Sequence, residues 1–358
     1  MEKDMLVQPR EKPATGFFSL KNTALLFITA VFFCALSAVA AFFVPASFGK
    51  PETVGVSVPY GAGLNSITGS LGDAGLLRSR TVFKLAAILT GARSKLKAGE
   101  YSFSTSYSMR TILDKLKKGD VVRYSVTVPE GSDLKDIARF LEDAGVADAS
   151  VFLSLANDRV FLKGLGIDYA SAEGLLFPDT YSFIKGEGEK KIIQAMWQRF
   201  RDKAPFDISR TYSVYGLSMS GYKLLKLASI IEKESKLDSE RPKVASVFYN
   251  RMKSPEAYQR RLESCATVRY ALDKKTGPIT YRDTRVESPY NTYIIIGLPP
   301  TPICSPGVKS MEAALRPADT GYRYFVVREN GEHTFSETLA GHEAAKTERK
   351  KLLRKNPR

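Results

Sequence analysis

Histidine and cysteine are scarce in this chain of 358 residues. It has two histidines, His333 and His342, and three cysteines, Cys34, Cys265 and Cys304. It contains no Cys-x-x-Cys and no His-Glu-x-x-His motif, which argues against a structural or catalytic zinc site. Three cysteines are too few for a disulfide scaffold, although their spacing leaves open whether Cys265 and Cys304 pair. We therefore expect a protein without a metal or other cofactor.

Two common catalytic signatures are also missing. No serine lies in a Gly-x-Ser-x-Gly motif, and no glycine-rich phosphate-binding loop is present. Serine hydrolases of that type and nucleoside triphosphatases therefore have no support in this sequence.

Negative charge is in short supply as well. Lysine and arginine total 53 against 38 acidic residues, which gives a formal net charge of +15. Such an excess suits an anionic partner, which can be nucleic acid, a membrane surface or an acidic polymer such as a cell wall, but it also suits a merely basic soluble surface. No recognised nucleic-acid-binding motif accompanies the charge, so we expect no nucleic-acid partner.

One long stretch carries no charge at all. Residues 24–44 run for 21 positions without a charge, a length that at about 1.5 Å per residue spans a bilayer core of roughly 30 Å. A cleavable signal peptide, cut after Ala38-Val39-Ala40, is the alternative. The apolar run continues past that site, which favours a transmembrane helix over residues 23–45.

The charges around this segment predict its orientation. Cations precede it more densely than they follow it, at Arg10, Lys12 and Lys21 against Lys50. The positive-inside rule then predicts a cytoplasmic N-terminus (1–22), a short linker (46–52) and a periplasmic or extracytoplasmic remainder. We thus expect a single-pass protein of the inner, cytoplasmic membrane.

An internal repeat follows the linker. Residues 56–75 align without gaps on residues 126–145, and about half of the positions are identical. Each copy predicts a strand, a Pro-x-Gly turn and an amphipathic helix. Between the copies, residues 81–89 and 108–116 predict helices and residues 99–104 a strand. Such modules suit glycan or wall binding, or a spacer that holds the next domain away from the membrane.

The segment 221–235 carries the most informative glutamate. On a helix, Leu227, Ile230 and Ile231 share one side, and Glu234 continues that apolar stripe. Glu232 then points the opposite way, toward solvent. A carboxyl that faces apolar side chains keeps its proton more readily than one in water, which suits a general acid. The alternative is an exposed glutamate in the last turn of a buried helix.

Further polar residues lie in two C-terminal stretches. Residues 290–307 combine an Asn-Thr-Tyr run, a segment that predicts a buried strand, and a proline-rich loop that suits the wall of a cleft. Residues 322–339 predict a hairpin around Asn330-Gly331. We expect four residues from these stretches and from the end of the Glu234 helix to bind substrate, namely Ser235, Asn291, Tyr293 and His333. The alternatives are a structural histidine at His333 and a purely structural turn at the prolines.

A single carboxyl limits the chemistry that is available. Ordinary glycosidases use two carboxylates, whereas one suffices if the sugar supplies the rest. In muramic acid the N-acetyl group can stabilise charge at C1, and the 6-hydroxyl can attack C1. Glu234 would protonate the leaving oxygen and then accept the proton of that hydroxyl. The product would be a 1,6-anhydro sugar, which defines a lytic transglycosylase.

Several sequence motifs connect this chemistry with one protein family. They are EGLLFPDTYSF (173–183), LASIIEKES (227–235), SERPKVASVFYNRM (239–252), YNTY (290–293), GLPPTPICSPG (297–307), AALRPADTGYRYFVV (313–327) and GEHTFSETLAGHE (331–343). With the N-terminal apolar segment, they closely resemble the MltG (YceG-like) endolytic murein transglycosylases. Where many relatives have Gln and Asp-Pro, this chain has Glu263 and Cys265-Ala266.

The resemblance implies a catalytic role for Glu234 and a LysM-like N-terminal part. It implies cleavage of the MurNAc-GlcNAc bond in nascent peptidoglycan, which terminates strand elongation, near synthases of the penicillin-binding protein class. We expect an α+β protein with a LysM-like region at 53–165, a catalytic domain at 166–350 that carries Glu234 near the end of a helix, and a basic tail at 351–358. A non-catalytic peptidoglycan-binding scaffold is the alternative.

Overall fold

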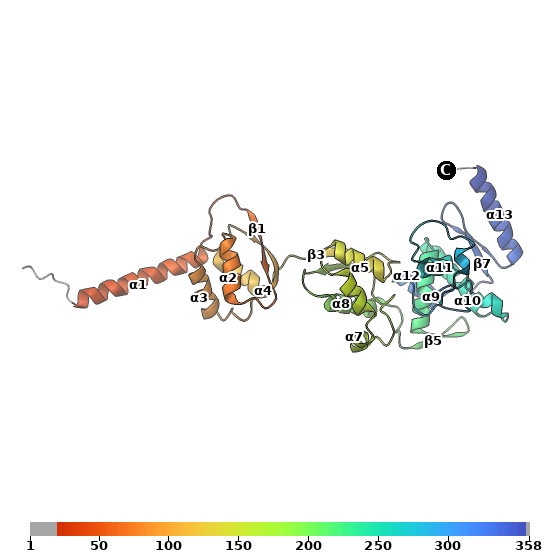
Figure 1. Cartoon of the computed structure of the whole chain (residues 1–358), viewed down its shortest axis with the longest axis horizontal. Coiled ribbons are helices and arrows are strands. Elements are labelled where there is room, and N and C mark those ends of the chain that lie inside the picture. The colour runs from red at the N-terminus through yellow and green to blue at the C-terminus, as the bar shows by residue number, and fades with distance from the viewer. Residues whose placement is uncertain (1–19, 356–358) are drawn as a thin grey trace, which may run out of the picture. The chain divides into compact units, whose positions relative to one another are not determined.

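The computed structural model in Figure 1 describes residues 20–355, with side chains from 23 to 352. Most of the predicted cytoplasmic segment (1–22) and the end of the predicted basic tail (356–358) lie outside the described residues. Helix α1 (Leu20–Phe43) comes first, and its part Thr23–Phe43 is long and apolar enough to cross a membrane. A signal sequence meets the same criteria, so composition alone identifies a candidate span.

The chain forms two compact units, which meet in sequence between Val122 and Arg123. After α1, the first unit has the order β1 (Thr53–Val58), α2 (Leu64–Asp73), α3 (Arg80–Leu89), β2 (Gly99–Ser104) and α4 (Met109–Lys118). Strands β1 and β2 pair antiparallel. The hydroxyls of Ser79 and Ser108 accept hydrogen bonds from the first turns of α3 and α4, as capping residues do. The predicted helices and strand between the repeat copies are confirmed.

The second unit begins with a similar arrangement. It has β3 (Tyr124–Thr127), α5 (Leu134–Asp143), α6 (Ala149–Ala156), α7 (Arg159–Gly164), β4 (Thr180–Phe183) and α8 (Glu189–Lys203). Strands β3 and β4 again pair antiparallel. The internal repeat is therefore a whole strand–helix–helix–strand unit, and α7 lies in extra sequence between α6 and β4.

A Tyr-Ser-Phe triplet on the second strand of each copy extends the repeat. The rings of Tyr101 and Phe103 stack with centroids 5.3 Å apart, and those of Tyr181 and Phe183 stack at 5.4 Å. Each tyrosine hydroxyl donates to the carbonyl four residues earlier. The two copies thus stack the same aromatic pair in the same way, with Tyr101 buried and Tyr181 half-buried. The alignment of residues 56–75 on 126–145 does not extend to these aromatic residues.

The rest of the second unit is mostly helical. It contains β5 (Thr211–Val214), β6 (Leu217–Ser220), α9 (Gly221–Glu234), α10 (Arg241–Met252), α11 (Cys265–Ala271), α12 (Val308–Leu315), β7 (Tyr324–Val327), β8 (His333–Ser336) and α13 (Leu339–Lys355). Short 3₁₀ turns lie at Asp238–Glu240, Ala257–Arg260 and Asp283–Arg285. Strand β5 pairs with β6, and β7 pairs with β8. The architecture is mixed α+β, as predicted.

Helix α9 is the centre of this unit. It packs against α12, α10, α11 and β6, and the side chains of Leu224, Leu227, Ile230 and Ile231 are fully buried. At its start, a Cβ on Gly221 would lie 2.3 Å from the carbonyl oxygen of Asp207. Glycine is required there because the helix begins against the backbone of the preceding turn.

One predicted element is wrong and one is confirmed. Every residue of 290–307 is described, and none lies in a strand. Ile294 and Ile296 are exposed, and the prolines that follow cannot donate ladder hydrogen bonds, so the segment runs as a loop. The predicted hairpin is confirmed as β7–β8, with Gly331 at a φ of 84° in its turn. The predicted domain limits 53–165 and 166–350 stay a prediction.

Candidate active site

Glu234 is the last residue of α9, and its side chain is neither fully buried nor fully exposed. Its Oε1 accepts a hydrogen bond from the Ser264 hydroxyl at 2.5 Å and one from the Ala266 N–H at 3.3 Å. Ser264 directly precedes α11, and Ala266 lies in the first turn of that helix. The carboxyl of Glu234 therefore accepts hydrogen bonds from two neutral donors at the start of α11.

The segment that supplies these donors is itself fixed. We call residues 263–266 the support segment. The N–H groups of Glu263 and Ser264 donate to the carbonyl and the hydroxyl of Thr292, at 3.1 and 2.9 Å. Glu263 has a φ of 51°, a left-handed conformation that costs energy for a residue with a side chain. The hydrogen bonds to Thr292 stabilise this turn, and the turn aims the Ser264 hydroxyl at Glu234.

Glu232 does not point to solvent, and this part of the prediction is wrong. Its side chain is only 7% exposed, and Oε2 lies 3.0 Å from Nη1 of Arg241. The Gly307 N–H donates to the same oxygen at 3.0 Å. The two-face argument fails because Arg241 of α10 and the loop before α12 cover Glu232. The exposed residues of α9 are instead Lys223 and Lys233. Glu232 thus ties α9 to α10 and to the loop before α12.

Tyr293 and Cys265 lie in the neighbourhood of Glu234. The Tyr293 hydroxyl is 3.2 Å from the Cys265 sulfur. Burial raises the pKa of both groups, and the negative charge of Glu234 adds to each shift. Of the four residues predicted to bind substrate, Tyr293 is the one that the structure brings to the carboxyl. All three cysteines of the chain are described and carry free thiols, so Cys265 and Cys304 are unpaired.

The other three predicted residues have internal partners. Asn291 is fully buried, and its amide nitrogen donates to the carbonyls of Thr284 and Val286. The Ser235 hydroxyl donates to the carbonyl of Leu237 at 2.9 Å. Nδ1 of His333 lies 2.7 Å from a carboxylate oxygen of Glu240. These contacts organise loops, and a substrate contact for Ser235, Asn291 or His333 stays a prediction.

Glu173 is a buried carboxyl to which the sequence analysis gave no role. It is 3% exposed, and its Oε2 accepts hydrogen bonds from the Leu134 N–H at 3.3 Å and the Tyr270 hydroxyl at 3.0 Å. Its Oε1 is buried without a hydrogen-bond partner among the described residues. Burial raises the pKa of Glu173 to about 8, and the charge of Asp133 adds to the shift. Glu173 links the start of α5 to α11.

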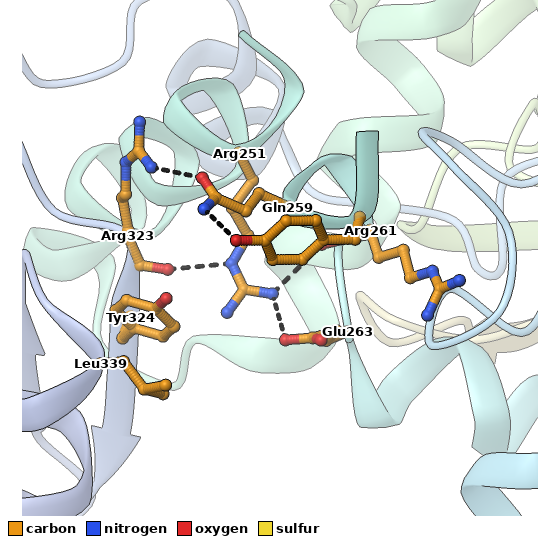
Figure 2. A pocket seen from close by; sticks show the side chains of 8 residues that line it. Arg251, Gln259, Arg261, Glu263, Arg323, Tyr324 and Leu339 are labelled. Atoms are coloured by element: carbon orange, nitrogen blue, oxygen red, sulfur yellow. Dashed lines mark hydrogen bonds and ion pairs between the residues drawn. The ribbon is translucent and has the colours of Figure 1, made fainter. Parts of the chain in front are cut away.

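A pocket of about 180 Å³ adjoins the support segment at Glu263. Figure 2 shows the Arg251 guanidinium between Arg323 and Glu263. Arg251 donates to the Glu263 carboxylate at 2.7 Å and to the Arg323 carbonyl at 2.9 Å, and it lies 5.2 Å over the Tyr324 ring. The Arg323 side chain donates to Gln259 at 2.7 Å. An aromatic wall with oriented polar groups is the kind of surface that orients a bound ligand such as a sugar.

A second pocket, of about 70 Å³, adjoins the other end of the support segment at Ala266. Its wall includes Lys233, the residue directly before Glu234, and Arg269, Tyr270 and Ile303. Pockets therefore lie at both ends of the short segment that holds the Glu234 carboxyl.

Comparison with known proteins identifies the family. The YceG-like family profile matches residues 56–348, which is most of the chain. The chain belongs to the YceG-like family.

Two relatives of this YceG-like protein carry the same name, endolytic murein transglycosylase. An endolytic murein transglycosylase of Bacillus subtilis is 32% identical over 320 residues, which cover 84% of this chain and 86% of the relative. An endolytic murein transglycosylase of Streptococcus pneumoniae is 29% identical over 314 residues, which cover 79% of this chain and 55% of the longer relative. A crystal structure of a YceG-like protein from Listeria monocytogenes is 31% identical, with a TM-score of 0.54 over 83% of this chain and 100% of that one.

Proposed function

We propose that this YceG-like protein is an endolytic murein transglycosylase, a lyase that cleaves the MurNAc-GlcNAc bond and leaves 1,6-anhydroMurNAc ends. The observation that carries the proposal is the Glu234 carboxyl, which rests on the Ser264 hydroxyl and the Ala266 N–H between two pockets. The names of the bacillary and streptococcal relatives support it.

The neighbouring carboxylates support a mechanism with one acid. Glu232 is paired with Arg241 in the protein interior, and Glu263 is paired with Arg251. Neither is free to act as the second carboxylate of a hydrolase without breaking an ion pair. In the proposed reaction, protonated Glu234 gives its proton to the leaving glycosidic oxygen. The resulting carboxylate accepts the proton of the 6-hydroxyl as that oxygen bonds to C1.

The support segment is proposed to hold the Glu234 carboxyl in both its protonated and its ionised form. Ser264 and Ala266 hold Oε1, so Oε2 is the oxygen left to exchange the proton. The carboxylate formed after the first step lies at the N-terminus of α11, where negative charge is stabilised. The Tyr293 hydroxyl next to Cys265 is placed to orient the substrate N-acetyl or hydroxyl groups.

Pockets at both ends of the support segment suit cleavage within a strand, since an endolytic enzyme must contact the strand on both sides of the bond that breaks. We assign the tandem β-α-α-β repeats to glycan binding of the LysM type. We assign α1 to a single membrane anchor of the inner membrane, with the N-terminus in the cytoplasm. The catalytic unit then faces nascent strands in the periplasm, beside synthases of the penicillin-binding protein class.

The test uses uncrosslinked glycan strands and mass spectrometry of the products. Wild-type protein should release fragments that end in 1,6-anhydroMurNAc, and Glu234→Gln should release none while keeping its unfolding midpoint. Glu312→Gln, which alters an exposed glutamate of α12, is the matched control and should cleave normally. Products with free reducing ends would indicate a muramidase, and intact strands with wild-type protein would indicate a non-catalytic scaffold.

A further inference from the structure

We propose that the pocket at Ala266 is an anion subsite, built by Lys233 and Arg269, which takes a carboxylate carried on or next to the muramic acid of the substrate. This inference rests on the proposed function, because the ligand is defined by its distance from Glu234. We call it the Lys233–Arg269 pocket.

The pocket adjoins the segment that holds the catalytic carboxyl. Ala266 lines it and donates its N–H to Glu234 at 3.3 Å. Arg269 and Tyr270 follow Ala266 by three and four residues on α11, so they share its face. Lys233 precedes Glu234 on α9. Both helices that position the acid therefore contribute a wall of this pocket.

The charges of the pocket do not cancel. Two of its lysines are neutralised, Lys275 by Asp133 and Asp136, and Lys274 by Asp283. Its second aspartate, Asp273, is paired with Lys135.

Lys233 and Arg269 have no carboxylate within ion-pair distance in the part of the chain that the structure describes. Lys233 donates to the Gly131 carbonyl at 3.0 Å. Arg269 donates to the carbonyls of Lys274 and Gly277, at 3.4 and 2.5 Å. Carbonyls orient these cations without neutralising them, so the two side chains face the pocket with uncompensated positive charge.

The size and the substrate chemistry fit a carboxylate. The pocket has a volume of about 70 Å³, which accommodates a carboxylate group. Muramic acid differs from N-acetylglucosamine by a lactyl group, which ends in a free carboxylate or continues into a peptide that carries its own. Lys233 directly precedes the acid, and Arg269 lies on the helix whose start holds it. Their positive charge would therefore place muramic acid, and not N-acetylglucosamine, at the side of the bond where C1 reacts.

The experiment measures binding, so that it does not depend on turnover. Full-length Glu234→Gln protein in detergent is titrated with three probes: peptide-bearing glycan strands, amidase-treated strands that keep only lactyl carboxylates, and chitohexaose, which has no carboxylate. Adding Lys233→Met should weaken the binding of at least one of the two carboxylate-bearing probes by roughly ten-fold or more, as expected for a lost charged hydrogen bond. The chitohexaose dissociation constant should not follow this change.

The probes also separate the two sources of the carboxylate. A loss of affinity confined to peptide-bearing strands assigns the subsite to the stem peptide, and an equal loss on amidase-treated strands assigns it to the lactyl group. Equal weakening for all three probes, or no weakening for any, overturns the proposal. If wild-type protein binds strands but never cleaves them, the proposed function fails while the subsite stands.

Matched variants guard against unfolding. Arg269→Lys keeps the charge and loses the two-pronged contact to the loop, so it should bind carboxylate-bearing strands better than Arg269→Met. Lys191→Met alters an exposed lysine of α8 that does not line the pocket, and it should leave all three dissociation constants unchanged.

Discussion

Replacing Glu173 with glutamine should change how the stability of the second unit depends on pH. The wild-type carboxyl is buried, and one of its oxygens has no partner among the described residues. Burial raises its pKa from 4.5 to about 8. Between these values the folded protein holds a proton that the unfolded chain releases. Stability from this group is therefore fully present below pH 4.5 and is lost as the pH rises toward 8.

The magnitude follows from the size of the shift. Each pH unit between the two pKa values costs the wild type about 1.4 kcal/mol, so the loss between pH 5 and pH 8 is about 4 kcal/mol. Glutamine does not titrate. Its buried amide nitrogen would cost about 1–3 kcal/mol at any pH, because it adds donors without acceptors. Glu173→Gln should thus be less stable than the wild type at pH 5 and more stable at pH 8.

The assay is urea unfolding of the full-length protein in detergent, followed by tryptophan fluorescence. Trp197 is the only tryptophan of the chain and is buried in α8 of the same unit as Glu173, so the signal reports on that unit. The free-energy difference between Glu173→Gln and wild type is measured at several pH values, with Glu312→Gln as the control. A difference that stays constant from pH 5 to pH 8 would refute the reasoning.

Three more outcomes are expected. Ser264→Ala should lower kcat/KM by roughly ten- to a hundred-fold, since it removes a hydrogen bond to the Glu234 carboxyl. A methanethiosulfonate reagent should inhibit cleavage by modifying Cys265, whose surface is accessible to solvent. Because the thiolate is the nucleophile and partial desolvation raises the pKa of this thiol, the reaction should be slow at neutral pH and faster as the pH rises. Arg241→Met should destabilise the second unit by about 3–5 kcal/mol, because it leaves Glu232 buried without its cation.

Each of these outcomes has its own check. Product analysis and urea unfolding of Ser264→Ala distinguish a catalytic loss from a folding defect. Cys265→Ser should resist the thiol reagent, and continued inhibition of that variant would mean that another group is modified. Adding Glu232→Gln to Arg241→Met should recover much of the lost stability, and a double variant as unstable as the single one would contradict the ion-pair argument.

The sequence predicted the elements whose signals are local. The apolar stripe placed Glu234 at the end of α9, the turn chemistry of Asn330-Gly331 placed the β7–β8 hairpin, and the repeat placed β3 and α5. Each signal lies within about twenty residues, where helical or strand periodicity dictates which side chains share a face.

The parts that could not be predicted depend on contacts between distant segments. Ser264 meets Glu234 from 30 residues further along the chain, and Tyr270 meets Glu173 across 97 residues. No periodicity links such positions. Glu232 was misplaced for the same reason, since the stripe argument puts it on the solvent side of α9, and the groups that cover it there, Arg241 and the Gly307 N–H, come from other segments.

The contrast between the two glutamates at the end of α9 explains why only one of them suits acid–base work. Glu232 is bound to a guanidinium inside the protein, so gaining a proton would break an ion pair and leave Arg241 buried with less compensation. Glu234 is bound to a hydroxyl and an amide, which are neutral and lose no counter-charge when the carboxyl is protonated. The fixed ion pair holds the helix end in place, and in the proposed mechanism this rigid end would let Glu234 change its charge twice in each cycle without the site rearranging.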